Sequence, residues 1–280
     1  MPAVFVLIWS TGFIVARYGM PHAPPLKFLV VRYALSVACF LVWVRLARVT
    51  WPRERMQWGH LAVTGVLMQA GYLGGVWAAV RAGMGSGLVA LLVGIQPVLT
   101  AIWLSLRGGM VTRPQWAGLL LGFIGLLLVV SRKLGEGGEV SVLTMSLAIM
   151  ALLSITSGTL YQKRFVAPCD VRSANAIQLA AALIVTLPFA ALEQESIHWN
   201  VASGGAMAWS VLALSLGGSS LLYMLIQRGT ATAVTSLLYL VPPCTAVMAW
   251  LLFSEPITAM TLAGIAITAI GVSLAVRGGR

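Results

Sequence analysis

The amino-acid sequence predicts an all-α integral membrane protein with ten transmembrane helices, arranged as two inverted five-helix repeats around a central cavity. Two observations predict this fold: the composition of the chain, and a register in which its second half repeats its first. Hydrophobic residues make up 59% of the 280 residues, charged residues make up 9%, and the mean hydropathy is +0.94. A soluble domain carries about 25% charged residues, so we expect lipid to surround most of this chain.

Ten apolar stretches approach the roughly 20 residues that a helix needs to cross a bilayer. Short polar or basic breaks separate them, which leaves little chain for a soluble domain. The first stretch has no basic start and no evident cleavage site, so we expect it to be retained as a helix. The stretches lie near residues 2–18, 26–46, 58–80, 86–106, 114–131, 142–163, 174–193, 206–227, 231–253 and 257–276.

The net charge of +11 indicates membrane topology rather than nucleic-acid binding, because Lys and Arg gather at the predicted helix ends. With the N-terminus inside, twelve basic residues face the cytoplasm and five face outward, with Arg32 left aside within a helix. We therefore expect a multi-pass protein of a bacterial-type cytoplasmic (inner) membrane, with both termini cytoplasmic. The inside set is Arg45, Arg48, Arg53, Arg55, Arg107, Arg113, Lys163, Arg164, Arg172, Arg228, Arg277 and Arg280; the outside set is Arg17, Lys27, Arg81, Arg132 and Lys133.

A shift of 146 residues aligns the second half of the chain with the first without a gap. It predicts two units, residues 1–135 and 136–280, with five spans each. An odd number of spans inserts the second unit in the opposite orientation, which suits alternating access to a solute site at the repeat interface. The shift places Gly12 on Gly158, Gly83 on Gly229, Leu91 and Leu92 on Leu237 and Leu238, Pro97 on Pro243, Thr112 on Thr258, Gly118 on Gly264 and Gly125 on Gly271.

Several short motifs resemble the EamA-type drug/metabolite transporters over essentially the whole chain. They are Trp9-Ser10, Pro25-Leu-Lys-Phe28 running to Arg32, Gln96-Pro97, Pro242-Pro243, Phe253-Ser-Glu255, and Gly264 with Gly271.

This resemblance implies a ten-helix exporter of small metabolites, and the chain looks most similar to bacterial exporters of amino acids, aromatic ones included. Lipophilic cations and other metabolites are the alternative substrates. The chain departs from the family pattern at Gly109, where an acidic residue often closes the fourth helix, whereas the second-half counterpart Glu255 is present.

Polar and aromatic residues recur at helical spacing within the predicted spans, for example Gln96, Thr100 and Trp103 at i, i+4 and i+7. A cavity lined by hydroxyl, amide and aromatic groups suits amphipathic solutes such as amino acids. For any single residue, an interhelical hydrogen bond or an interfacial aromatic belt is the alternative. The candidate substrate-binding residues are Ser10, Thr11, Gln69, Tyr72, Trp77, Gln96, Thr100, Trp103, Ser157, Tyr161, Ser220, Tyr223, Gln227 and Tyr239.

Pro97, Pro242 and Pro243 predict helix breaks at corresponding places in the two halves. Proline removes a backbone donor, and paired interruptions indicate a binding or gating site, although prolines in membrane helices often only kink them. Arg32, inside the second helix, has two interpretations. It contacts a substrate carboxylate, or it snorkels outward or binds carbonyl groups at helix ends; its shallow depth favours the second.

The seven acidic residues and three histidines all fall in loops or near the ends of predicted helices. Because a proton relay within the membrane normally uses such groups, we expect an uncoupled carrier, or uniporter. We expect no cofactor, no metal site and no nucleic-acid partner. The GxxxG spacing of Gly71 with Gly75, and of Gly118 with Gly122, predicts helix packing within the monomer, and no oligomer is indicated.

Other functional classes lack their motifs in this sequence. An embedded enzyme is disfavoured because HExxH, GxSxG, a P-loop and an aspartate-rich motif are all missing. A channel is disfavoured because no ring of charge or filter-like loop is evident. Phosphate-bearing metabolites would need several basic residues in the cavity, and only Arg32 qualifies.

Overall fold

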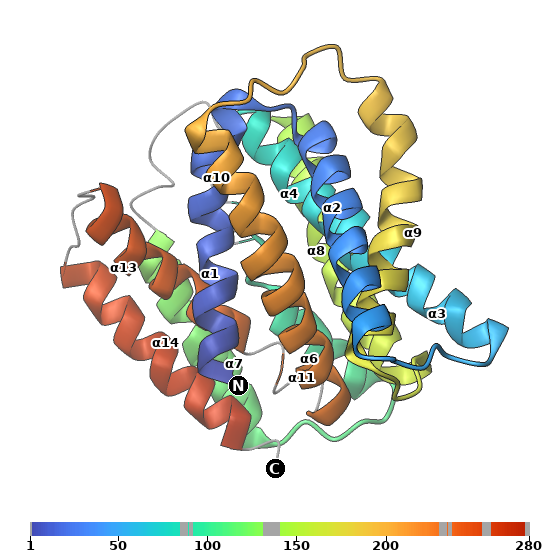
Figure 1. The fold of residues 1–280 in the computed structure, drawn as a ribbon. Coiled ribbons are helices and arrows are strands. Elements are labelled where there is room, and N and C mark those ends of the chain that lie inside the picture. Colours follow the sequence, from blue (N-terminus) through green and yellow to red (C-terminus); the bar gives the residue numbers. More distant parts are fainter. Residues whose placement is uncertain are drawn as a thin grey trace.

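The computed structural model of the chain is a bundle of long helices (Figure 1). It describes residues 2–84, 89, 92–130, 141–229, 234, 237–253 and 259–277, and no strand occurs among these residues. The helical elements are α1 (Pro2–Gly19), η1 (Met20–His22), α2 (Pro25–Leu46), α3 (Arg55–Gly65), η2 (Val66–Gly71), α4 (Tyr72–Arg81), α6 (Gln96–Leu106), α7 (Arg113–Val130), α8 (Val142–Phe165), α9 (Val171–Ala191), α10 (Val201–Trp209), η4 (Ser210–Ser219), α11 (Ser220–Arg228), η5 (Leu237–Leu240), α13 (Val241–Phe253) and α14 (Ala259–Arg277).

Among the described residues, six helical stretches are long and apolar enough to cross a bilayer. Shorter apolar helices lie within the fourth, ninth and tenth predicted stretches. The prediction of an all-helical membrane protein is therefore confirmed, whereas the count of ten spans and the inverted repeat stay predictions. The long stretches are Pro2–His22, Pro25–Leu46, Arg55–Arg81, Val142–Phe165, Val171–Ala191 and Val201–Arg228, and the shorter ones are Gln96–Leu106, Leu237–Leu252 and Leu262–Ala275.

Local sequence determines where several of these helices begin. Ser141 caps α8 because its Oγ accepts a hydrogen bond from the Thr144 backbone N–H at 3.1 Å, and the Thr144 hydroxyl accepts one from the Ser141 N–H at 2.9 Å. Asn200 and Ser203 form the same reciprocal capping box at α10. Pro25 stands in the first turn of α2, where its missing N–H removes no helical hydrogen bond.

Two of the long stretches are interrupted by π-helix. The segment η2 winds as π-helix between α3 and α4, and η4 does the same between α10 and α11. A shift of 146 residues places Gly71 on Gly217, so the two π segments overlap in the register of the repeat. Because π-helical insertions in α-helices are frequent at functional sites, both segments mark places to look for one.

Glycines bring several helices into backbone contact. A Cβ atom added to Gly118 of α7 would lie 2.5 Å from a backbone nitrogen of α14, and one added to Gly271 would lie 2.4 Å from the backbone nitrogen of Gly122. Gly75 of α4 approaches α8 in the same way, since a Cβ there would lie 2.7 Å from the Leu147 carbonyl oxygen. The prediction that these glycines pack helices within the monomer is confirmed.

The two ends of the bundle carry different contacts. Helix α1 begins and helix α14 ends at one end of the bundle (Figure 1), which we call the termini end. The segment 192–200 crosses the opposite end from α9 to α10 (Figure 1). There the Glu193 carboxylate accepts hydrogen bonds from two backbone N–H groups in the first turn of α2, at 3.0 and 2.8 Å. Glu195 forms an ion pair with Arg81 at the end of α4. This end is therefore tied together by polar contacts between the two halves of the chain.

Candidate functional site

Arg32 lies in the interior of the bundle, where α2 packs against α4 and η4. Its side chain is 3% exposed, and its Nε donates a hydrogen bond to the Ser215 Oγ at 3.0 Å. The interpretation that Arg32 snorkels toward water is therefore wrong. Its position on α2 turns the side chain toward η4, and Ser215 supplies a polar partner there.

Arg32 also lines a small cavity with aromatic walls. The cavity has a volume of about 40 Å³, which leaves room for on the order of three water molecules. A solute as large as an amino acid does not fit in this volume, so its binding would require the surrounding helices to separate. Trp9 and Gly12 of α1, Tyr72 and Trp77 of α4, and Leu214 of η4 line it together with Arg32.

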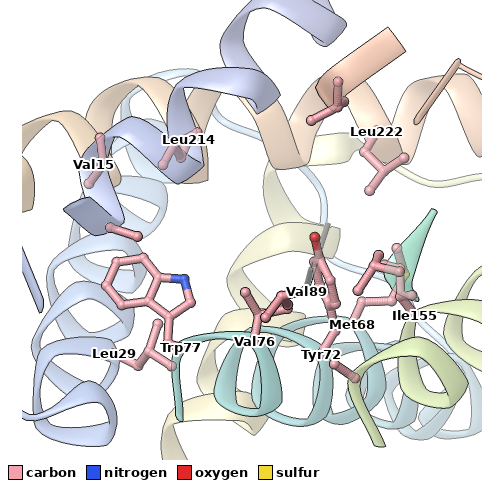
Figure 2. Close-up of a cluster of buried hydrophobic side chains, with 14 of the residues drawn as sticks. Val15, Leu29, Met68, Tyr72, Val76, Trp77, Val89, Ile155, Leu214 and Leu222 are labelled. Atoms are coloured by element: carbon pink, nitrogen blue, oxygen red, sulfur yellow. The ribbon is translucent and has the colours of Figure 1, made fainter. Parts of the chain in front are cut away.

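The aromatic side chains of this cavity are fixed by their neighbours. The rings of Trp9 and Tyr72 are nearly parallel, with centroids 6.4 Å apart and an interplanar angle of 4°. Trp77 packs against Phe28 of α2, with ring centroids 5.1 Å apart. Figure 2 shows Tyr72, Val76 and Trp77 projecting from the same side of α4, across from Leu214. The wall is thus a preformed apolar surface with a single strong charge beside it.

That charge has no acidic partner among the residues that line the cavity. Removing a guanidinium from water is expensive unless hydrogen bonds or an opposite charge compensate it. The Ser215 hydroxyl supplies one such bond, and a carboxylate entering the cavity would supply a charge-assisted one. The site can therefore attract an anionic group next to an apolar or aromatic body.

Three further candidates of the first half lie in contacts between helices. The Ser10 hydroxyl donates to the carbonyl oxygens of Val6 at 2.6 Å and Val241 at 3.3 Å, which joins α1 to α13. The Thr11 hydroxyl accepts a hydrogen bond from the Trp209 Nε1 at 2.8 Å. The Gln69 side chain donates to the Ser219 Oγ at 3.3 Å. None of the three lines the Arg32 cavity.

The candidates on α6 separate into buried and exposed residues. Gln96 and Thr100 are fully buried, and the Gln96 Nε2 donates to the Thr159 Oγ1 at 3.2 Å. Trp103 is 46% exposed and lies beneath Arg107 instead. Trp103 stands in the last turn of α6, and its assignment to a substrate site stays a prediction.

Three buried polar groups near the predicted helix breaks have no hydrogen-bond partner in the described part of the chain. They are the Gln96 Oε1, the Thr100 Oγ1 and the Tyr239 hydroxyl. A buried polar atom without a partner costs free energy, so each group is available to a ligand or a water molecule.

The candidates of α8 and α11 gather toward the termini end, apart from Arg32. Ser157 is exposed on α8, and its assignment to a substrate site stays a prediction. The Tyr161 hydroxyl lies 2.8 Å from the His60 Nδ1, and the Tyr223 hydroxyl lies 3.1 Å from the Cys169 Sγ. Two residues complete the set: the Gln227 Nε2 donates to the Val166 carbonyl at 3.3 Å, and the buried Ser220 hydroxyl has no partner among the described residues.

The predicted proline breaks coincide with the starts of helices. Pro97 is buried in the first turn of α6 and follows a turn at Gly94 and Ile95. Pro243 is buried in the first turn of α13 and follows the 3₁₀ turn η5. Pro242 precedes it in the same turn. In both spans the regular α-helix therefore begins within two residues of the proline, which lacks a backbone donor for the preceding turn.

Ser215, Leu214, Gly12 and Trp9 belong to this site but were not among the predicted substrate-binding residues. The repeat register could have identified Ser215, because a shift of 146 residues places Gln69 on it. Leu214 and Gly12 carry no chemical feature that separates them from the many other apolar or small residues of the chain.

Comparison with known proteins identifies a family. The model of the EamA-like transporter family matches residues 3–131 and 142–277. The chain is 27% identical over 277 residues to the uncharacterized transporter YvbV of Bacillus subtilis, covering 97% of this chain and 89% of that protein. It is 24% identical over 286 residues to a probable amino-acid metabolite efflux pump of Salmonella typhimurium, covering 98% and 93%.

A solved structure shares the fold. A protein crystal structure superimposes with a TM-score of 0.82 at 16% sequence identity, covering 100% of this chain and 96% of that one. A further relative, the uncharacterized inner membrane transporter YedA of Escherichia coli, is 27% identical over 253 residues, covering 88% of this chain and 80% of that protein.

Proposed function

Because the chain belongs to the EamA-like transporter family and is a multi-pass membrane transporter, we propose that it exports amino acids, including aromatic ones. The family and the names of its relatives indicate a transporter rather than an enzyme. The name of the Salmonella relative, a probable amino-acid metabolite efflux pump, agrees with this substrate class. The YedA relative, an inner membrane transporter, supports placing this chain in a bacterial inner membrane.

The observation that carries the substrate class is the buried Arg32 beside Trp9, Tyr72 and Trp77. An amino acid offers a carboxylate for the guanidinium and a side chain for the aromatic wall. Aromatic and aliphatic amino acids fit this pattern better than strongly polar ones, because the remaining wall is apolar.

The same charge argues against lipophilic cations in this cavity. A cation would approach the Arg32 guanidinium in a low-dielectric interior without an acidic residue on the cavity wall to compensate it. Phosphorylated metabolites carry more negative charge than one guanidinium neutralises. Both classes remain useful as comparison substrates in the assay below.

We further propose that transport follows alternating access between two inverted units, residues 1–135 and 136–280. Four features support this arrangement. The family model matches two consecutive stretches of similar length. The π segments overlap in the repeat register. Helix α2 packs on α9, and α7 packs on α14, which pairs corresponding helices of the two units. Segment η2 packs on α8 as η4 packs on α1, so these contacts exchange when the units are exchanged.

The proposed carrier works as a uniporter, driven by the solute gradient. The described acidic residues Glu54, Asp170, Glu193 and Glu195 cap helices or lie in the segment after α9. They are therefore far from the middle of a span, where a proton relay would need them. The termini end, which carries Arg45, Arg53 and Arg164, is the cytoplasmic face in this proposal.

The test is uptake by the purified full-length chain in liposomes. Phenylalanine, leucine, choline, a dye cation and a sugar phosphate are offered at equal gradients, and empty liposomes serve as the control. The proposal expects saturable uptake of phenylalanine and leucine above the other three solutes. Saturable uptake of the cations alone, or of the sugar phosphate alone, would overturn it.

A further inference from the structure

A second hollow lies between α6 and α8, toward the termini end. Its volume is about 620 Å³, and no residue lines both this groove and the Arg32 cavity. Its walls extend from Leu99 to Arg107 along α6 and from Leu153 to Phe165 along α8. At 1.5 Å per residue, the groove follows the helices for roughly 12 to 18 Å.

Two arginines, Arg107 and Arg164, lie at the end of the groove where helices α6 and α8 finish. The Arg107 Cζ lies 4.7 Å from the centroid of the Trp103 ring, and the Arg164 Cζ lies 5.3 Å from that of the Phe165 ring. These contacts hold both guanidinium groups at the groove. No described residue that lines the groove is acidic, so the mouth of the groove carries a net positive charge.

The rest of the groove offers an apolar wall. The Thr156 and Ser157 hydroxyls donate to carbonyl oxygens four residues earlier in α8, at 2.7 and 2.6 Å. The Tyr161 hydroxyl is paired with the His60 Nδ1 at 2.8 Å. With these hydroxyls engaged inside the protein, leucine, isoleucine and aromatic side chains form most of the lining.

We propose that this groove binds an anionic phospholipid, with an acyl chain along the apolar wall and the phosphate between Arg107 and Arg164. The amphipathic lining, the length of the groove and the position of both arginines at helix ends match such a molecule. Basic pockets between transmembrane helices are known to receive anionic headgroups. In the repeat register, the counterparts of Arg107 and Arg164 are Phe253 and Tyr18, so the repeat does not account for the two charges.

Native mass spectrometry of the delipidated full-length protein tests this proposal. Phosphatidylglycerol and phosphatidylcholine with identical acyl chains are added separately, and the concentration giving half-maximal binding is compared. Two basic residues near a phosphate favour the anionic lipid by roughly 30-fold. The double variant Arg107→Gln with Arg164→Gln should lose this preference. The control, Arg45→Gln with Arg53→Gln, removes two exposed charges from the same end and should retain it.

A second variant tests the acyl chain separately from the charges. Ser157→Trp places a large ring in the groove from an exposed position and leaves both arginines in place. It should weaken phosphatidylglycerol binding, whereas millimolar inorganic phosphate should not displace the lipid from the unmodified protein. Equal binding of the two lipids, equal loss in the control variant, or a dimer that excludes lipid would each overturn the proposal. The readout is binding, so it is independent of the transported substrate.

Discussion

The Nε of Arg32 and the Oγ of Ser215 lie 3.0 Å apart, which joins a buried charge on α2 to the π-helical segment η4. This contact links the two halves of the chain at the wall of the aromatic cavity. An ionisable group inside a membrane span is expensive to maintain and is therefore a strong candidate for function.

Replacing Arg32 with glutamine keeps a hydrogen-bonding side chain but removes the charge. We expect uptake of phenylalanine into proteoliposomes to fall by about 10- to 100-fold, because a hydrogen bond to a charged group contributes about 1.5–3 kcal/mol. Arg45→Gln removes an exposed charge from the other end of α2 and should change uptake by less than about twofold. Equal losses in the two variants would argue against a substrate contact at Arg32.

Trp9→Leu removes the ring that stacks on Tyr72 and keeps an apolar side chain. Aromatic pairs contribute about 0.5–1.5 kcal/mol beyond their buried area, so phenylalanine uptake should fall roughly 2- to 10-fold more than leucine uptake. The control Trp58→Leu changes a half-exposed indole at the start of α3 and should affect both solutes alike. A uniform loss with Trp9→Leu would contradict an aromatic subsite.

Gly271→Ala should destabilise the α7–α14 contact. The added Cβ would lie 2.4 Å from the backbone nitrogen of Gly122, and the backbone of α7 cannot easily move away from it. Overpacking of this kind typically costs about 1–3 kcal/mol, which thermal unfolding in detergent would detect as a lower midpoint. Gly204→Ala is the matched control, because no atom lies within 4 Å of its added Cβ. A midpoint as low in the control would contradict the packing explanation.

Glu193→Ala should loosen the end of the bundle opposite the termini. Its carboxylate accepts two backbone hydrogen bonds at the start of α2, and loss of about 1 kcal/mol there would accelerate local amide exchange roughly fivefold. Glu54→Ala is the control, because Glu54 stands at the start of α3 without a side-chain capping bond. Hydrogen exchange of the first turn of α2 and of residues 192–200 measures the effect. Unchanged exchange in Glu193→Ala would show that the capping bonds do not hold this end.

A proton gradient should not drive accumulation of substrate. The described acidic residues lie at helix ends or after α9, so no carboxylate among them is placed to carry a proton through the middle of a span. In proteoliposomes with a constant phenylalanine gradient, an imposed pH gradient of either sign should change the initial rate by less than about twofold. A large and sign-dependent change would replace the uniporter with a coupled carrier.

The helical fold and the packing glycines could be predicted because they depend on local composition and spacing. Continuous apolar stretches leave a helix as the only way to pair the backbone in lipid, and GxxxG spacing permits close approach. The burial of Arg32 could not be predicted from its depth in the helix. It depends on which face of α2 meets η4, and that is set by tertiary packing.

The candidate site could be predicted only in part. Tyr72, Trp77 and Arg32 line one cavity, whereas Trp103 and Tyr161 line the groove between α6 and α8. Helical spacing identifies residues that share a face, but it does not say whether that face meets the interior or the surface. For Trp103 the decisive feature is its position in the last turn of α6, which spacing alone does not reveal.

The most direct test of the account compares two solutes that differ in one group. Phenylalanine and phenethylamine share the aromatic ring and the amine, but only phenylalanine carries a carboxylate. We expect saturable uptake of phenylalanine but not of phenethylamine by the unmodified protein in liposomes, and loss of that discrimination in Arg32→Gln. Uptake of both solutes at equal rates, or discrimination that survives the loss of Arg32, would contradict it.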